Sequence, residues 1–186
     1  MKRLRIPPGR LQDLACLLLL ISVVIGCKQF EHIVRPTVLR SADGKFQITV
    51  PAGWSERHSL NAEASIAAVN PREETYVIVI TENKSDFASD ITLDKFTEVI
   101  RDRMSSKLKF PQVTPPTPVT INGKPGRQYL LQGEGKLVKL TYLVTMVETD
   151  EHFHQIITWT LTSRIDQNQG VLDQVTNSFR KVPADK

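Results

Sequence analysis

Two histidines, His152 and His154, are the side chains whose type and spacing come nearest to a metal site. They lie two residues apart on a segment that alternates like a β-strand, so we expect both rings on the same face of a sheet. Two nitrogen ligands could share a metal ion with Asp150 or Glu148, but a catalytic zinc site has three protein ligands and a structural site four. We therefore expect weak, unspecific metal affinity and predict no metal site.

No other residues have a spacing typical of an enzyme. His58 stands beside Ser59 and His32 lies near the N-terminus, yet neither has an acidic residue at a fixed spacing that would indicate a catalytic triad. The sequence contains no phosphate-binding or dinucleotide-binding glycine loop, no nucleophile elbow and no zinc-protease motif. We predict no catalytic residues, no bound cofactor and no enzymatic activity.

Cys27 carries the clearest chemical signal, because it follows four cationic side chains and an apolar run over residues 14–26. This order is typical of an export signal, and the run is too short to span a bilayer. Its end, Val-Ile-Gly-Cys at positions 24–27, resembles the lipobox of bacterial lipoproteins, in which the cysteine becomes the acylated N-terminus. We predict that residues 1–26 are a signal peptide and that Cys27 anchors the exported protein to a bacterial membrane through lipid. The alternative is an ordinary cleaved signal or an uncleaved anchor in which Cys27 is incidental.

The charge of the exported part excludes a nucleic-acid-binding protein. Residues 1–26 hold four of the 24 Lys and Arg residues and one of the 20 Asp and Glu residues, which leaves a net charge of +1. The remaining charges are interspersed, without a basic run that could follow a phosphate backbone. The second cysteine, Cys16, lies in the apolar run, so we expect no disulfide.

We expect residues 27–36 to form a short tether and residues 37–182 a single domain. An extended tether of this length keeps the domain within about 30 Å of the bilayer. Asp43 and Gly44 between apolar runs indicate a hairpin, and Gly133 to Gly135 is interpreted as a second hairpin turn. In residues 75–82 the side chains at both odd and even positions are apolar, which predicts a strand buried on both faces. Strands are expected over residues 37–40, 46–50, 65–69, 75–82, 127–132, 137–148 and 152–162.

Two amphipathic segments predict helices that cover one antiparallel sheet. The first begins at Thr92, whose hydroxyl can cap a free amide. The second covers about residues 168–179. Apolar side chains recur every three or four residues along the first helix, at Leu93, Phe96, Ile100, Met104 and Leu108.

Two other features have both a structural and a functional interpretation. The prolines between Pro111 and Pro118 predict an extended, exposed connection, which is either a plain crossover or a surface for a partner. Trp54 and Trp159 fit core positions better than interface anchors, since large aromatic residues next to a strand end or in mid-strand usually fill a core.

Four short motifs, at residues 46–54, 92–93, 121–126 and 175–179, resemble the PsbP-like superfamily. This superfamily includes extrinsic photosystem II proteins, DcrB-type envelope lipoproteins and Ran-binding Mog proteins. The resemblance covers nearly the whole exported chain. It implies an α+β fold, an α/β/α sandwich around an antiparallel sheet, in proteins that are mostly binding or assembly factors. Some photosynthetic members are themselves lipoproteins, which agrees with an anchor at Cys27.

Two functions from different classes follow. The first is a lipid-anchored, non-catalytic accessory or assembly protein that docks on a membrane protein complex, with a photosystem-related role among those that the resemblance implies. The second is an envelope lipoprotein that binds a small molecule or a metal ion in a pocket between sheet and helix. The absence of an acid, base and nucleophile in fixed spacing favours the first.

Overall fold

The computed structural model describes residues 35–135 and 138–183. The predicted signal at residues 1–26, Cys27 and most of the tether lie outside these ranges. The chain from Pro36 onward forms a compact unit of its own. Among the described residues, no helix is both long and apolar enough to cross a bilayer.

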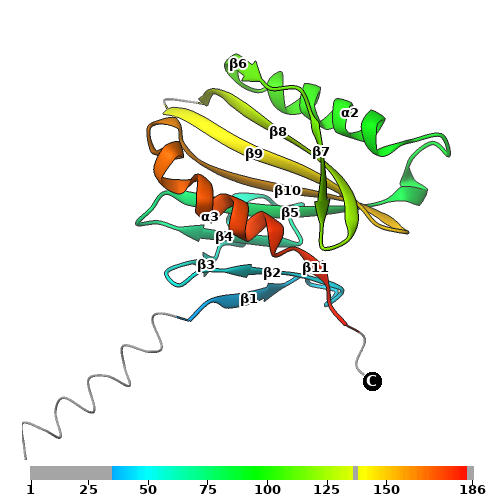
Figure 1. The fold of residues 1–186 in the computed structure, drawn as a ribbon, viewed down its shortest axis with the longest axis horizontal. Coiled ribbons are helices and arrows are strands. Elements are labelled where there is room, and N and C mark those ends of the chain that lie inside the picture. The colour runs from blue at the N-terminus through cyan, green and yellow to red at the C-terminus, as the bar shows by residue number, and fades with distance from the viewer. Residues whose placement is uncertain (1–34, 136–137, 184–186) are drawn as a thin grey trace, which may run out of the picture. The chain divides into compact units, whose positions relative to one another are not determined.

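A large antiparallel sheet is the centre of the domain (Figure 1). Its strands are β3 (Ser55–Glu56), β4 (Ile66–Asn70), β5 (Thr75–Asn83), β6 (Lys109–Val113), β7 (Thr117–Ile121), β8 (Lys124–Gly135), β9 (Val138–Glu148) and β10 (His152–Leu161). They are ordered β3-β4-β5-β10-β9-β8-β6, and β7 also pairs with β8. The long central strands therefore come from both halves of the domain.

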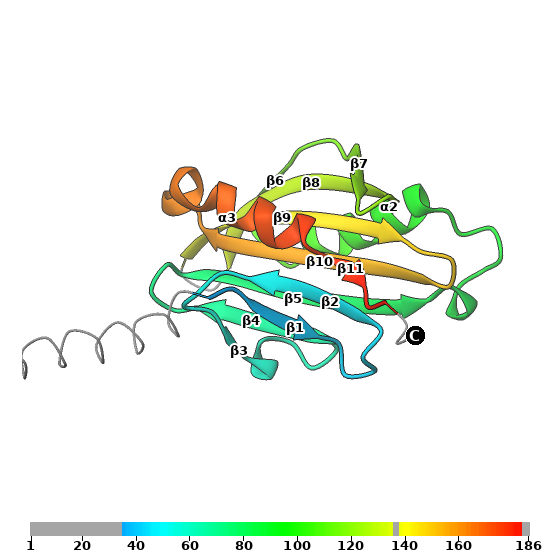
Figure 2. The same ribbon diagram turned by 60° about the horizontal axis from the view of Figure 1, so that its bottom comes forward.

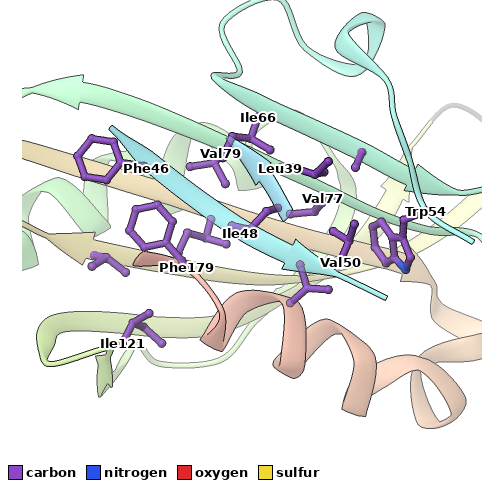
Figure 3. Packing of buried hydrophobic residues seen from close by; sticks show 14 residues of the cluster. Leu39, Phe46, Ile48, Val50, Trp54, Ile66, Val77, Val79, Ile121 and Phe179 are labelled. Atoms are coloured by element: carbon purple, nitrogen blue, oxygen red, sulfur yellow. The ribbon is translucent and has the colours of Figure 1, made fainter. Parts of the chain in front are cut away.

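One face of this sheet is covered by a second, small sheet and by the helix α3. The small sheet has the strand order β1-β2-β11. These elements are β1 (Thr37–Arg40), β2 (Phe46–Val50), β11 (Arg180–Lys181) and α3 (Ile165–Asn177). Figure 2 shows α3 and the small sheet side by side on the near face. Ile48, Val77 and Phe179 are buried between these layers (Figure 3), and so are Ile156 and Val175.

The opposite face is covered by α2 (Leu93–Ser105). Phe96 and Ile100 of α2 are buried against the sheet, and the Phe96 ring stacks on Phe153 of β10 at a centroid distance of 4.6 Å. Thr92 caps the helix, because its hydroxyl accepts a hydrogen bond from the amide of Lys95 at 3.2 Å. The predicted start and apolar face of this helix are confirmed.

The α+β sandwich is confirmed, and so are most expected strands. Strand β5 is buried on both faces as predicted, with Val77 and Val79 in one core and Ile78 and Ile80 in the other. Trp54 lies in the first core, also as predicted. Among the described residues, both cores are built from residues 39–179.

Two expectations about connections and element ends are wrong. Gly133 to Gly135 is not a turn but the end of β8, paired with the beginning of β9. Glycine is needed at position 133 because a Cβ there would lie 2.8 Å from the Cβ of Leu108. The last helix begins three residues earlier than expected, at Ile165, after a 3₁₀ turn. The proline segment is extended and mostly exposed as predicted, and it forms β6 and β7 along the edge of the sheet.

Candidate functional site

The β6–β7 edge, residues 109–121, is the outer border of the large sheet next to β8. Both strands run antiparallel to β8, and Thr114 between them keeps the contact through its amide, which donates to the carbonyl of Leu130 at 3.0 Å. Every residue of β6 is exposed. Proline has no backbone amide to donate, and an edge strand tolerates it because the amides on the outer side of an edge have no strand to pair with. The same prolines hinder another strand from pairing with this edge.

Phe110 is the most unusual residue of the β6–β7 edge. The pairing shifts by one residue between Lys109 and Gln112, which is a β-bulge. Phe110 lies in this bulge with φ +52° and with 82% of its surface exposed. A bulky residue with positive φ is strained, and such strain is concentrated at functional sites. Phe110 is not among the residues that the sequence predicts to be functional. Its position directly before Pro111 in an exposed segment was the available signal.

His152 and His154 do lie on one face of β10, as predicted, with ring centroids 5.8 Å apart. Their environments differ, however. His154 is fully buried, its ring contacts Phe46 of the small sheet at 4.3 Å, and its Nδ1 and Nε2 lie 3.1 Å from the hydroxyls of Thr81 and Thr149 respectively. Both ring nitrogens therefore have partners within the protein, and His154 is a core residue.

Electrostatics keep His154 neutral. Burial, with a smaller contribution from His152, lowers its pKa to about 3, against a weaker opposite effect of Asp43. Within residues 35–135 and 138–183, no group of three or more His, Cys, Asp and Glu side chains is arranged to hold a metal ion. His58 is exposed and lies 3.5 Å from the carboxylate of Glu56. Cys27 and His32 are outside the described residues.

A pocket of about 480 Å³ opens beside His152, where the β1–β2, β7–β8 and β9–β10 connections meet β11. Phe46 and Phe179 form part of its wall. Its rim carries both signs of charge, and Lys124 lies 3.6 Å from Asp150 across it. The Lys124–Asp150 ion pair engages two of the charges at this rim, which weakens the pocket as a candidate for a bound ion.

A second hollow, the α2 groove, has a volume of about 340 Å³ and lies between α2 and the central strands. Its floor consists of Ile78 and Ile80 of β5 and Ile157 of β10. The side chains on α2 that line it are Ile100, Arg103 and Met104, followed by Lys107 and Leu108. An apolar floor with a few polar groups at the rim is the usual composition of a small-molecule site.

An aromatic row closes one end of the α2 groove. Trp159 of β10 stacks on Tyr76 of β5, with centroids 5.1 Å apart and an interplanar angle of 8°, and it lies 5.9 Å from Tyr142 of β9. Trp159 and Tyr142 line the groove and are only half-buried. Burial raises the pKa of Tyr142, so its hydroxyl is neutral. Trp159 therefore sits at a groove, and the expected core position is only partly correct.

Comparison with known proteins identifies the fold. No protein-family model matches the sequence, and no curated protein matches it either. CyanoP, the cyanobacterial PsbP from Synechocystis sp. PCC 6803, has a similar structure with a TM-score of 0.61 at 15% identity, covering 81% of this chain and 94% of that chain. The chain has the PsbP-like fold.

Two further structures share this PsbP-like fold. LpqN, which is involved in cell envelope biogenesis of Mycobacterium tuberculosis, has a TM-score of 0.55 at 13% identity, covering 81% of this chain and 92% of that chain. The Saccharomyces cerevisiae Ran-binding protein Mog1p has a TM-score of 0.53 at 11% identity, covering 79% of this chain and 95% of that chain. The resemblance predicted from the short motifs is confirmed for the fold.

Proposed function

We propose that this chain is an exported, non-catalytic accessory protein, held on a membrane by acylated Cys27, that docks on a membrane protein through its β6–β7 edge. Phe110 is the observation that carries the proposal. An aromatic side chain that is 82% exposed and held in a strained bulge has little to contribute to the isolated fold. Exposed aromatic residues are enriched among the residues that dominate binding energy in protein interfaces.

The proposed lipid anchor supports a partner in the same membrane. A lipid anchor at Cys27 would confine the domain to the membrane surface. Anchoring also raises the effective concentration of the domain near other membrane proteins, so a modest interface suffices.

Proteins with the same fold support a binding role. Mog1p is a Ran-binding protein, and LpqN is involved in cell envelope biogenesis. The prolines of the β6–β7 edge exclude the addition of an extra β-strand as the mode of docking at their positions, because they lack an amide to donate. The proposed interface therefore uses side chains, with Phe110 entering a pocket on the partner and Val113, which is also exposed, beside it.

Anchoring is tested by the intact mass of the protein extracted from membranes. We expect a chain that begins at Cys27 and carries lipid, and a Cys27→Ser variant that is released from the membrane fraction. A mature chain that begins elsewhere and is recovered without lipid would contradict the anchor.

Docking is tested by crosslinking in native membranes followed by purification. Phe110→Ser should reduce the recovered partner about tenfold or more, equivalent to the loss of one interface hot spot. Val99→Ser is the matched control, because Val99 is an exposed apolar residue of α2, 50% accessible. Equal recovery with both variants would contradict docking through Phe110. The domain is also tested with vesicles that contain no protein. If it binds them and Phe110→Ser abolishes this binding, the partner of Phe110 is the lipid surface and not a protein.

A further inference from the structure

The α2 groove has a direction that follows from the strand register. Phe96, near the start of α2, stacks on Phe153, which pairs with Glu82 on β5. Leu108, just beyond the end of α2, lies over Gly133, which pairs with Leu140 on β9. The helix therefore runs from the Glu82 end of the groove towards the aromatic end formed by Trp159 and Tyr142.

Charges are separated along this direction. Arg103 and Lys107, in the last turn of α2 and just after it, line the groove at its aromatic end. Neither forms an ion pair with a carboxylate in the described part of the chain, whereas Lys95 at the other end of α2 contacts Asp90 at 2.6 Å. Glu82 lies at the opposite end, where its carboxylate accepts a hydrogen bond from Gln155 at 2.8 Å, and Glu63, which precedes β4, is the second carboxylate that lines the groove.

The floor between these ends is apolar and well buried. Ile78, Ile80 and Ile157 are 6%, 9% and 5% exposed, so each presents a small accessible patch to the groove and keeps the rest of its side chain in the core. A ligand that covered these patches would gain about 25 cal/mol for each Å² of apolar surface removed from water. The volume of about 340 Å³ lies within the range of small-molecule sites.

We propose that the α2 groove binds a small organic anion with an apolar body, its charged group at Arg103 and Lys107 and its body on the isoleucine floor beside Trp159. The two cations supply charge complementarity at one end, and an Arg guanidinium can also hold a carboxylate or sulfonate through two hydrogen bonds. The aromatic row provides a planar wall next to this charged end. The site is independent of the β6–β7 edge, so its failure would leave the docking proposal untouched.

The test uses the domain from Pro36 to Lys186, which forms a compact unit of its own. The probe is 1-anilinonaphthalene-8-sulfonate, an aromatic sulfonate, measured by titration calorimetry. We expect one site per chain and a roughly tenfold weaker affinity in an Arg103→Gln, Lys107→Gln double variant. Lys95→Gln is the control on the same helix and should change the affinity less than about twofold.

A second probe separates charge from apolar contact. The uncharged analogue N-phenyl-1-naphthylamine should bind more weakly than the sulfonate and should bind the double variant and the unchanged domain equally. If the sulfonate binds both proteins with the same affinity, or binds at many weak sites, the proposed site is overturned. The proposal is also overturned if Lys124→Gln, at the pocket beside His152, weakens the sulfonate and the double variant does not.

Trp159 provides an optical measurement of the same site. The chain has 2 tryptophans, and Trp54 lies in the opposite core, so a Trp54→Phe variant reports on Trp159 alone. Saturating sulfonate should quench this emission by energy transfer with the affinity found by calorimetry. Should Trp54→Phe fail to fold, comparison of the unchanged domain with Trp159→Phe gives the same information. If the emission of Trp159 does not change when the probe binds, the probe does not bind in the α2 groove beside Trp159.

Discussion

One face of the large sheet is covered by α3 and the small sheet, whereas the other is covered by the single helix α2 with loop residues beside it. On the first face Ile48 and Ile156 have no accessible surface at all. On the second face Trp159 and Tyr142 remain half-buried at the end of the α2 groove. The difference shows that the single helix α2 leaves two aromatic side chains of its face partly accessible at the end of the α2 groove.

The largest expected effect is a loss of stability when side chains of α2 are removed from the second core. Phe96 is 1% exposed and packs on Phe153, so Phe96→Ala should lower the free energy of unfolding by about 3–5 kcal/mol, and Ile100→Ala by about 2–5 kcal/mol. Denaturant melts of the isolated domain measure both. Val99→Ala on the exposed side of α2 is the control, with a change within about 0.5 kcal/mol. Equal small losses in all three would show that α2 contributes little to the core.

A smaller effect is expected on the first face, from the buried His154. Its pKa is about 3 in the folded protein, against an ordinary value of 6.5 in an unfolded chain, so the unfolded chain takes up the proton first as the pH falls. Stability is thus full above about pH 7 and is lost between about pH 6.5 and pH 3, with a decrease of about 2 kcal/mol from pH 7 to pH 5. Denaturant melts at pH 7 and pH 5 measure this loss.

The groups around His154 define the control for this pH effect. His152 and Asp43 are the charged or titratable neighbours that influence it, and ordinary carboxylates stay ionised above about pH 5. In His154→Gln the stability should therefore change much less between pH 7 and pH 5. An unchanged pH dependence in this variant would assign the effect to other residues.

The elements that could be predicted from the sequence are those whose pattern is local. The apolar residues at positions 46, 48 and 50 and the three- to four-residue period from Leu93 to Leu108 each mark one apolar face. The cap at Thr92 is a contact within a single turn. These features need no knowledge of distant residues. The burial of β5 on both faces could also be predicted, because its odd and even positions are both apolar.

The features that could not be predicted depend on contacts between distant segments. Glycine usually marks turns, but Gly133 makes room for Leu108, 25 residues earlier in the sequence. The proline segment resembles a simple connection, since nothing in its own sequence shows that β8 pairs with it. The α2 groove arises from several separate elements, and the charge separation along it appears only once the strand register is known.

The central claim is that the β6–β7 edge, and not the face covered by α3, contacts a membrane protein. A photo-crosslinking residue, p-benzoylphenylalanine, in place of Phe110 tests it most directly in native membranes, with the same residue in place of Gln174, which is exposed on α3, as the control. We predict a discrete crosslinked protein band, identified by mass spectrometry, from position 110 and none from position 174. Crosslinks from position 174 alone, or to lipid alone from position 110, would contradict the claim.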